Sequence, residues 1–171
     1  RLRGRIEAVL DWATVKGWRK GDNPARFKGH MEYLLPKVRA GTKSHHASLP
    51  YEELPKFLTK LKAETGMARY ALEFLILCAS RTGEVVGAQW EEIDLAKGIW
   101  TIPGERMKAG KEHRIPLGKR TLEILTTIRP FSGKKFIFIT GKKDVAMSTM
   151  AMAMLLRRME VTDATVHGMR S

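Results

Sequence analysis

The sequence predicts a mostly helical α+β fold, in which helices pack around one small antiparallel sheet of three strands. Apolar residues recur at helical spacing in several long segments, and short β-like segments cluster between residues 99 and 117. Hydrophobic residues make up 43% of the 171 residues, which is enough to build a core and excludes wholesale disorder.

The helices are predicted from apolar spacing and from the residues that end them. Residues 1–16 form an amphipathic pattern that stops at Gly17. Ser48 is expected to cap a helix whose first turn holds Pro50 and two glutamates. Residues 67–79 are apolar nearly all round, which is typical of a central core helix. Further helices are expected over residues 86–90, 119–128 and 150–159.

The predicted sheet comes from three short segments close together in the chain. Residues 99–102, 105–108 and 113–117 are expected to be its strands, with Ala109-Gly110 as the hairpin turn. Residues 136–139 also have a strand-like composition.

The chain is predicted to hold parts of two domains. Residues 41–48 lack a buried pattern and are basic, so we interpret them as a linker between residues 1–40 and 49–171. Helical patterns already run at the first residue and at the last, so we expect a piece of a longer protein.

Composition narrows the class of protein further. The formal net charge of +13 favours a polyanionic partner, nucleic acid first, although a solvated basic surface is the alternative. A single cysteine, Cys78, excludes an intramolecular disulfide framework and a cysteine-rich zinc site. This cysteine usage indicates a reduced, intracellular protein. No apolar run approaches the length of a membrane helix, so we expect no membrane contact.

Three basic motifs could carry chemistry, and each also has a structural explanation. Arg81 follows the apolar helix, where it could bind an anion or only pair with Glu84 three residues later. His167 and Arg170 would share one face of a helical turn capped by Thr165 and suit a phosphate, but a lone H-x-x-R is weak evidence. The hairpin 106–114 could reach DNA or could be a charge-protected edge.

The order of these motifs resembles the catalytic domain of the tyrosine recombinases, the phage integrase family, and especially integrases of prophages and genomic islands. The resemblance rests on Ala79-Ser80-Arg81-Thr82-Gly83-Glu84-Val85, the basic hairpin that ends in Ile115-Pro116-Leu117, and His167-x-x-Arg170, and it covers most of residues 49–171. Residues 1–40, with Asp22-Asn23-Pro24-Ala25-Arg26, resemble the helical end of the family's core DNA-binding domain.

The resemblance implies a role for each matching residue. Arg81 and Arg170 would bind the non-bridging oxygens of the scissile phosphate, where fixed cations offset the growing charge. Lys108 would be the general acid for the leaving 5′-oxygen, with Lys111 as its competitor, and His167 would assist proton transfer. Glu84 would orient Arg81.

The nucleophilic tyrosine of the family should follow His167-x-x-Arg170. The chain's tyrosines, Tyr33, Tyr51 and Tyr70, all precede Arg81, so the chain is expected to lack the nucleophile and to be inactive alone. From the charge pattern, the expected DNA contacts are Lys43 in the linker and Arg106, Lys111, His113 and Arg114 in the hairpin.

The resulting hypothesis is a site-specific DNA recombinase that cleaves and rejoins DNA through a 3′-phosphotyrosyl intermediate and needs no metal or cofactor. The expected partners are double-stranded attachment-site DNA, further copies in a tetramer, and accessory DNA-bending or directionality proteins, in the bacterial cytoplasm at the nucleoid. The alternatives are a non-catalytic DNA-binding module and a metal-dependent nuclease. For the latter, Glu91, Glu92 and Asp94 are the candidate ligands, although a solvent-facing turn explains them better.

Overall fold

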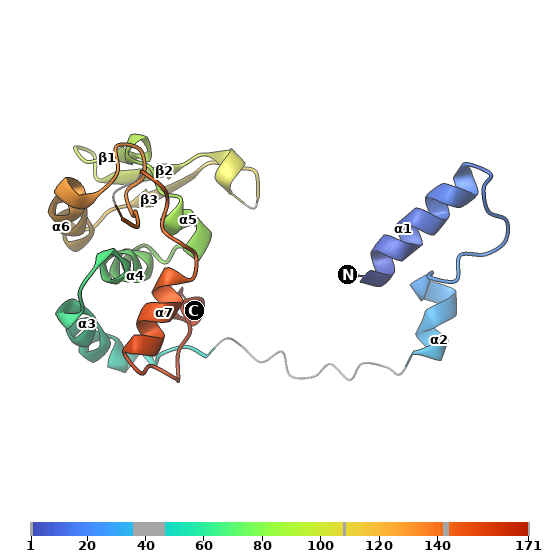
Figure 1. Ribbon diagram of the computed structural model, residues 1–171, viewed down its shortest axis with the longest axis horizontal. Coiled ribbons are helices and arrows are strands. Elements are labelled where there is room, and N and C mark those ends of the chain that lie inside the picture. Colours follow the sequence, from blue (N-terminus) through green and yellow to red (C-terminus); the bar gives the residue numbers. More distant parts are fainter. Residues whose placement is uncertain (1, 36–46, 108, 142–143, 171) are drawn as a thin grey trace. The chain divides into compact units, whose positions relative to one another are not determined.

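The chain divides into two compact units in the computed structural model, Arg1–Ser44 and His45–Ser171 (Figure 1). The structure describes residues 2–35, 47–107, 109–141 and 144–170. The division between the units falls inside the segment 41–48, and the assignment of the first unit to a core-binding domain stays a prediction. Among the described residues, no helix is both long and apolar enough to cross a membrane.

The first unit contains α1 (Leu2–Val15), a short interrupted helical turn (Phe27–Met31) and α2 (Glu32–Leu34). The predicted helix over residues 1–16 is confirmed by α1. The buried Asn23 ties the following loop to this helix, because its side-chain amide donates to the Glu7 carbonyl and to the Asp11 carboxylate, both at 2.8 Å.

The second unit holds the remaining helices and the sheet. Its helices are α3 (Leu54–Ala63), α4 (Met67–Cys78), α5 (Thr82–Val86), α6 (Lys119–Ile128) and α7 (Ala151–Arg158). Its strands are β1 (Ile93–Asp94), β2 (Ile99–Ile102) and β3 (His113–Pro116). Single 3-10 turns cover Tyr51–Glu53, Trp90–Glu92, Gly104–Arg106, Arg129–Phe131 and Gly168–Arg170.

The predicted three-stranded antiparallel sheet is confirmed, but one of its strands is not the expected one. The order is β1-β2-β3, with Trp100 opposite Ile93 on one side and Ile115 on the other. The strand predicted over residues 105–108 is wrong: Gly104–Arg106 is a 3-10 turn, and β1 takes the third place. Residues 136–139 form only isolated bridges, through Phe136 and Ile139.

Two helix starts also differ from the prediction. The helix predicted over residues 86–90 is wrong, because α5 ends at Val86 and Trp90–Glu92 is a 3-10 turn. The Glu84 carboxylate accepts a hydrogen bond from the Arg81 backbone N–H and so caps the first turn of α5, which begins at Thr82. Ser48 caps no helix; the chain enters α3 through the turn Tyr51–Glu53, which follows Pro50.

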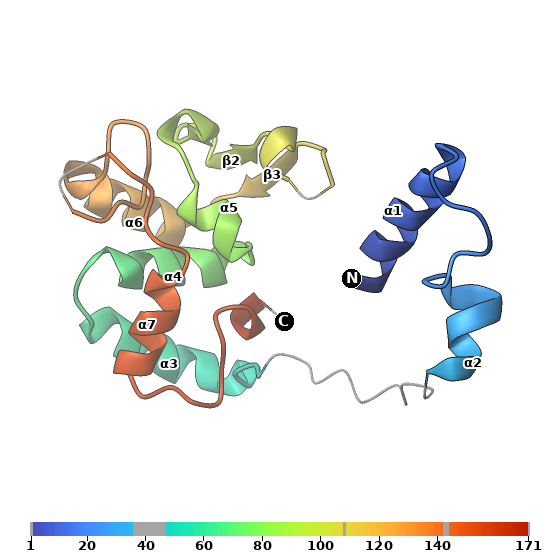
Figure 2. The same cartoon turned by 45° about the vertical axis from the view of Figure 1, so that its right-hand side comes forward.

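Helix α4 forms the centre of the core, as its all-round apolar pattern predicts. It packs against α3, α5, α6 and α7, and in Figure 2 it lies between α6 and α7. Its Phe74 meets Trp100 of β2 and Phe138 edge to face, with ring centroids 5.2 and 5.4 Å apart. The end of this helix, where Arg81 follows, is therefore anchored by packing.

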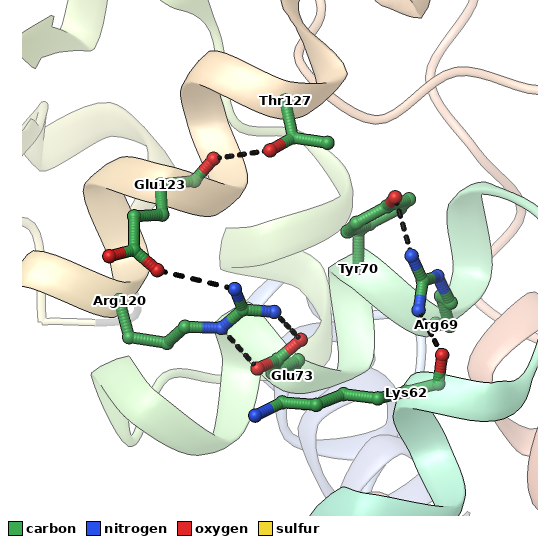
Figure 3. Close-up of polar contacts among 7 residues, drawn as sticks. All are labelled: Lys62, Arg69, Tyr70, Glu73, Arg120, Glu123 and Thr127. Atoms are coloured by element: carbon green, nitrogen blue, oxygen red, sulfur yellow. Dashed lines mark hydrogen bonds and ion pairs between the residues drawn. The ribbon is translucent and has the colours of Figure 1, made fainter.

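One charged pair fastens α4 to α6 (Figure 3). Arg120 donates from Nε and Nη2 to the two carboxylate oxygens of the buried Glu73, at 2.7 and 3.0 Å. Its Nη1 lies 3.3 Å from Glu123 on the same helix. The hydrogen bonds to Glu73 raise the pKa of Arg120, so the Arg120 guanidinium stays charged.

Candidate active site

A cleft of about 460 Å³ opens beside the C-terminal end of α4. Residues from three distant parts of the chain meet there: the corner between α4 and α5, the loop between β2 and β3, and the turn near the C-terminal end. Its lining residues are Ala79, Ser80, Arg81, Glu84, Met107, Ala109, His113 and Arg170. The structure therefore brings together four of the predicted site residues, namely Arg81, Glu84, His113 and Arg170.

Arg81 is held at the first turn of α5 by Glu84. Its backbone N–H donates to Glu84 Oε2 at 2.8 Å, and its Nη1 donates to Glu84 Oε1 at 2.7 Å. The Arg81 side chain keeps 43% of its surface exposed, whereas the Glu84 side chain keeps 7%. Glu84 therefore holds one edge of a guanidinium that still lines the cleft, and its orienting role in the reaction stays a prediction.

The Glu84 carboxyl stays ionised in this position. Its burial by itself raises its pKa, but the backbone and side-chain hydrogen bonds from Arg81 and the charges of Arg81 and Arg170 outweigh burial, so the net pKa is lowered.

Arg170 reaches the same cleft from the turn Gly168–Arg170. Its Nε donates to the carbonyl of Ala79 at 2.7 Å, two residues before Arg81. Ala79 has φ 47° and ψ 38°, a left-handed conformation that ends α4. Sequence reasoning missed this contact, because no apolar or capping signal distinguishes a non-glycine residue at such a position.

The turn that carries Arg170 is tied to the segment before α3. Thr165 caps it as predicted, since its Oγ1 accepts from the Gly168 backbone N–H at 3.0 Å. The Thr165 N–H donates to the Ala47 carbonyl at 2.9 Å. A Cβ on Gly168 would lie 1.9 Å from that carbonyl oxygen, so only glycine fits there. Among the described residues that line the cleft, Arg170 is present and the exposed His167 is not.

The predicted general acid and the predicted DNA contacts fall into three groups, and Arg106 alone makes up the third. Lys108 and the linker residue Lys43 lie outside the described residues, although Met107 and Ala109 on either side of Lys108 line the cleft. Lys111, His113 and Arg114 are exposed, which leaves their role in DNA binding a prediction.

Arg106 does not point outward as a DNA contact should. It forms an ion pair with the buried Glu92 and donates from Nη2 to the Glu84 carbonyl at 2.6 Å, while 20% of its side chain remains exposed. The expected solvent-facing position of Glu92 is wrong for the same reason. Sequence reasoning missed this pair because its members are fourteen residues apart and belong to different turns.

Neither a tyrosine nor a metal-binding cluster accompanies the cleft among the described residues. None of the three tyrosines, Tyr33, Tyr51 and Tyr70, lines the cleft. Among the described residues, no three His, Cys, Asp or Glu side chains are grouped so that they could hold a metal ion. The cleft presents the guanidinium groups of Arg81 and Arg170, which are suited to bind an anion.

The chain is similar to known proteins in both sequence and fold. Residues 48–171 match the model of the phage integrase family. The chain is 30% identical to the integrase of Enterobacteria phage P4 and 34% identical to the prophage integrase IntZ of Escherichia coli K12. Each match covers the whole chain but 42% of the relative, so the chain spans less than half the length of these proteins.

Solved structures share the fold at low sequence identity. A lambda integrase dimer bound to a COC′ core site gives a TM-score of 0.67 at 17% identity, over 98% of this chain and 62% of that one. The Tn1549 transposon integrase in complex with circular intermediate DNA gives 0.68 at 12% identity, over the same shares of the two chains.

Proposed function

Because this chain belongs to the phage integrase family, we propose that it forms the phosphate-activating part of a site-specific DNA recombinase. The complete protein would cleave and rejoin DNA through a 3′-phosphotyrosyl intermediate. The observation that carries the proposal is that Arg81 and Arg170 line the same cleft although they are far apart in the sequence. Arg170 is held there by the carbonyl of Ala79, 91 positions earlier in the chain.

The cleft suits a pentacoordinate phosphate. Two guanidinium groups from separate elements can each contact a non-bridging oxygen, and they already hold their places through Glu84 and the Ala79 carbonyl. Preorganised cations of this kind stabilise the extra negative charge of the transition state without reorganising during the reaction. Lys108 is proposed as the general acid for the 5′-oxygen, because both its neighbours line the cleft. His167 is proposed to assist proton transfer.

The substrate and assembly follow from the same assignment. Double-stranded attachment-site DNA is the proposed partner, contacted in part by Lys43, Lys111, His113 and Arg114. A tetramer on DNA is proposed because a lambda integrase tetramer bound to a Holliday junction shares the fold, with a TM-score of 0.67 at 16% identity. Accessory DNA-bending or directionality proteins and action on nucleoid DNA in the bacterial cytoplasm belong to the same proposal. Covalent capture conserves the energy of the phosphodiester, so no metal or nucleotide is required.

A covalent-adduct assay in chelator tests the proposal. A full-length protein containing this chain should form a denaturation-resistant adduct with nicked attachment-site DNA in excess EDTA. The chain alone should form none, because none of its tyrosines lines the cleft. Cleavage that depends on a divalent metal would favour a nuclease, DNA binding without any adduct would favour a binding module, and an adduct at Tyr33, Tyr51 or Tyr70 would overturn the site assignment.

A further inference from the structure

A buried acidic group, Glu92, is linked through Arg106 to the cleft residue Glu84 and takes no part in the chemistry proposed above. The Glu92 side chain is 5% exposed and pairs with Arg106. Its Oε2 also accepts hydrogen bonds from the indole N–H of the fully buried Trp100 at 3.0 Å and from the Gln89 backbone at 3.3 Å. Glu92 is thus a fixed acceptor, held by the core strand β2 and by the turn that precedes β1.

Arg106 joins this acceptor to α5, the helix that follows Arg81 directly. Its Nη1 contacts Glu92, and its Nη2 donates to the Glu84 carbonyl at 2.6 Å. Carbonyls in the last turn of a helix lack an intrahelical partner, and in the short α5 the guanidinium supplies one to Glu84. The Glu84 carboxylate in turn holds Arg81.

The Arg106 guanidinium packs closely against the backbone at Gly87. A Cβ on Gly87 would lie 2.9 Å from Arg106 Nη2. In the loop between β2 and β3, a Cβ on Gly104 would lie 2.7 Å from the Gly110 carbonyl oxygen, so the two sides of this loop lie close together there. Arg106 therefore stands at the point where this loop joins the domain, immediately before Met107, which lines the cleft.

We propose that Arg106 is a positioning residue for strand cleavage: through Glu92 and the Glu84 carbonyl, it fixes the loop that carries Met107 and Ala109 against α5, the helix that follows Arg81 directly. The inference rests on the proposed function, in which Lys108 protonates the leaving oxygen. A general acid works only within hydrogen-bond reach of its target, and a displacement of about 1 Å can cost about 100-fold in rate. Loss of the Arg106 anchor should therefore impair proton donation rather than DNA affinity.

Arg114 offers a matched control on the same hairpin. Its side chain is 71% exposed and its ion pair with Glu112 lies at the surface. Arg114→Gln removes the same charge as Arg106→Gln but leaves Glu92 and the Glu84 carbonyl untouched. If Arg106 were a DNA contact, the two substitutions would weaken DNA binding alike and make it less dependent on salt.

The experiment uses a full-length protein containing this chain and two nicked DNA substrates. One has an ordinary scissile phosphodiester, and the other has a bridging 5′-sulfur, a leaving group that needs no general acid. Arg106→Gln should cleave the ordinary substrate about 10- to 100-fold more slowly, recover to within a few fold on the sulfur substrate, and bind DNA as the parent does. Glu92→Gln should show the same pattern with a smaller rate loss. The cleavage rate of Arg106→Lys should lie between the rates of Arg106→Gln and the parent.

The outcomes separate the inference from the function it rests on. Lys108→Ala calibrates the assay: if the sulfur substrate does not rescue it, the general-acid assignment fails and this inference fails with it. If Lys108→Ala is rescued but Arg106→Gln is not, or if Arg106→Gln cleaves at the parental rate, Arg106 has no positioning role. A misfolded variant cannot be rescued by a better leaving group, so rescue distinguishes positioning from lost stability.

Discussion

Two arginine–glutamate pairs, one on the middle of α4 and one just beyond its C-terminal end, have arginines of similar exposure and very different roles. The side chains of Arg120 and Arg81 are 40% and 43% exposed, and each pairs with a glutamate that is nearly buried. Arg120 uses Nε and Nη2 on Glu73 and turns Nη1 to Glu123, so its hydrogen bonds join two helices. Arg81 gives one terminal nitrogen to Glu84 and lines the cleft. What an arginine does here is decided by where its donors point rather than by its exposure.

The largest expected effect is a difference in strand-cleavage rate between substitutions of the two arginines. In a full-length protein, Arg81→Ala should slow strand cleavage about 10²- to 10³-fold, the range found when one preorganised transition-state donor is removed. Arg120→Ala, assayed where it is folded, should cleave within a few fold of the parent. Single-turnover cleavage at saturating protein measures both. Equal losses for the two variants would show that the cleft arginine has no special role.

Stability should respond in the opposite order. Arg120→Ala leaves the Glu73 carboxylate buried without its bidentate partner, and we expect a loss of about 3 kcal/mol in the free energy of unfolding. Arg81→Ala should cost less than about 1 kcal/mol, because the Glu84 carboxylate keeps its bond to the Arg81 backbone N–H. Urea unfolding of the chain checks this order, and a greater loss for Arg81→Ala would contradict it.

The sequence could predict those elements and site residues that are marked by apolar spacing or by a short motif. The helices around Phe74 and Ile124 follow from apolar spacing, and Arg81 and Arg170 follow from their motifs. The strand predicted over residues 105–108 failed because Arg106 is drawn inward by Glu92, a contact across distant turns. The left-handed Ala79 that orients Arg170 had no local signal either. The missing information was tertiary in both cases.

The Glu84 carboxyl gives a pH-dependent test of the cleft. Its pKa in the folded protein lies below its ordinary value of 4.5, so the stability it contributes is fully present above that value and is lost as the pH falls through the lower folded pKa. Glu84→Gln should therefore be less stable than the parent at pH 6, and the gap should narrow below pH 4.5. Thermal unfolding across this range measures the gap; a gap that does not change with pH would mean that the pair is not held as described.

The smallest expected effect is on the reactivity of Cys78, the last residue of α4, which lies in the sequence between Glu73 of the first pair and Arg81 of the second. Burial raises the pKa of the Cys78 thiol to about 12, although its hydrogen bond with Thr121 opposes the shift. Only about 10⁻⁴ of this thiol is ionised at pH 8, so a thiol-reactive dye should label it far more slowly in native protein than in urea. Fast native labelling would show that this end of the helix opens readily, and then Arg81 could not be fixed by packing.

The central claim is that Arg81 stabilises negative charge on the scissile phosphate, and a neutral substrate tests it most directly. A methylphosphonate at the scissile position lacks one anionic oxygen, so it needs less positive charge in the cleft. A full-length protein carrying Arg81→Ala should cleave the ordinary phosphodiester about 10²- to 10³-fold more slowly than the parent and should recover most of that loss on the methylphosphonate. An Arg81→Ala variant that is equally impaired on both substrates, or impaired on neither, would contradict the account.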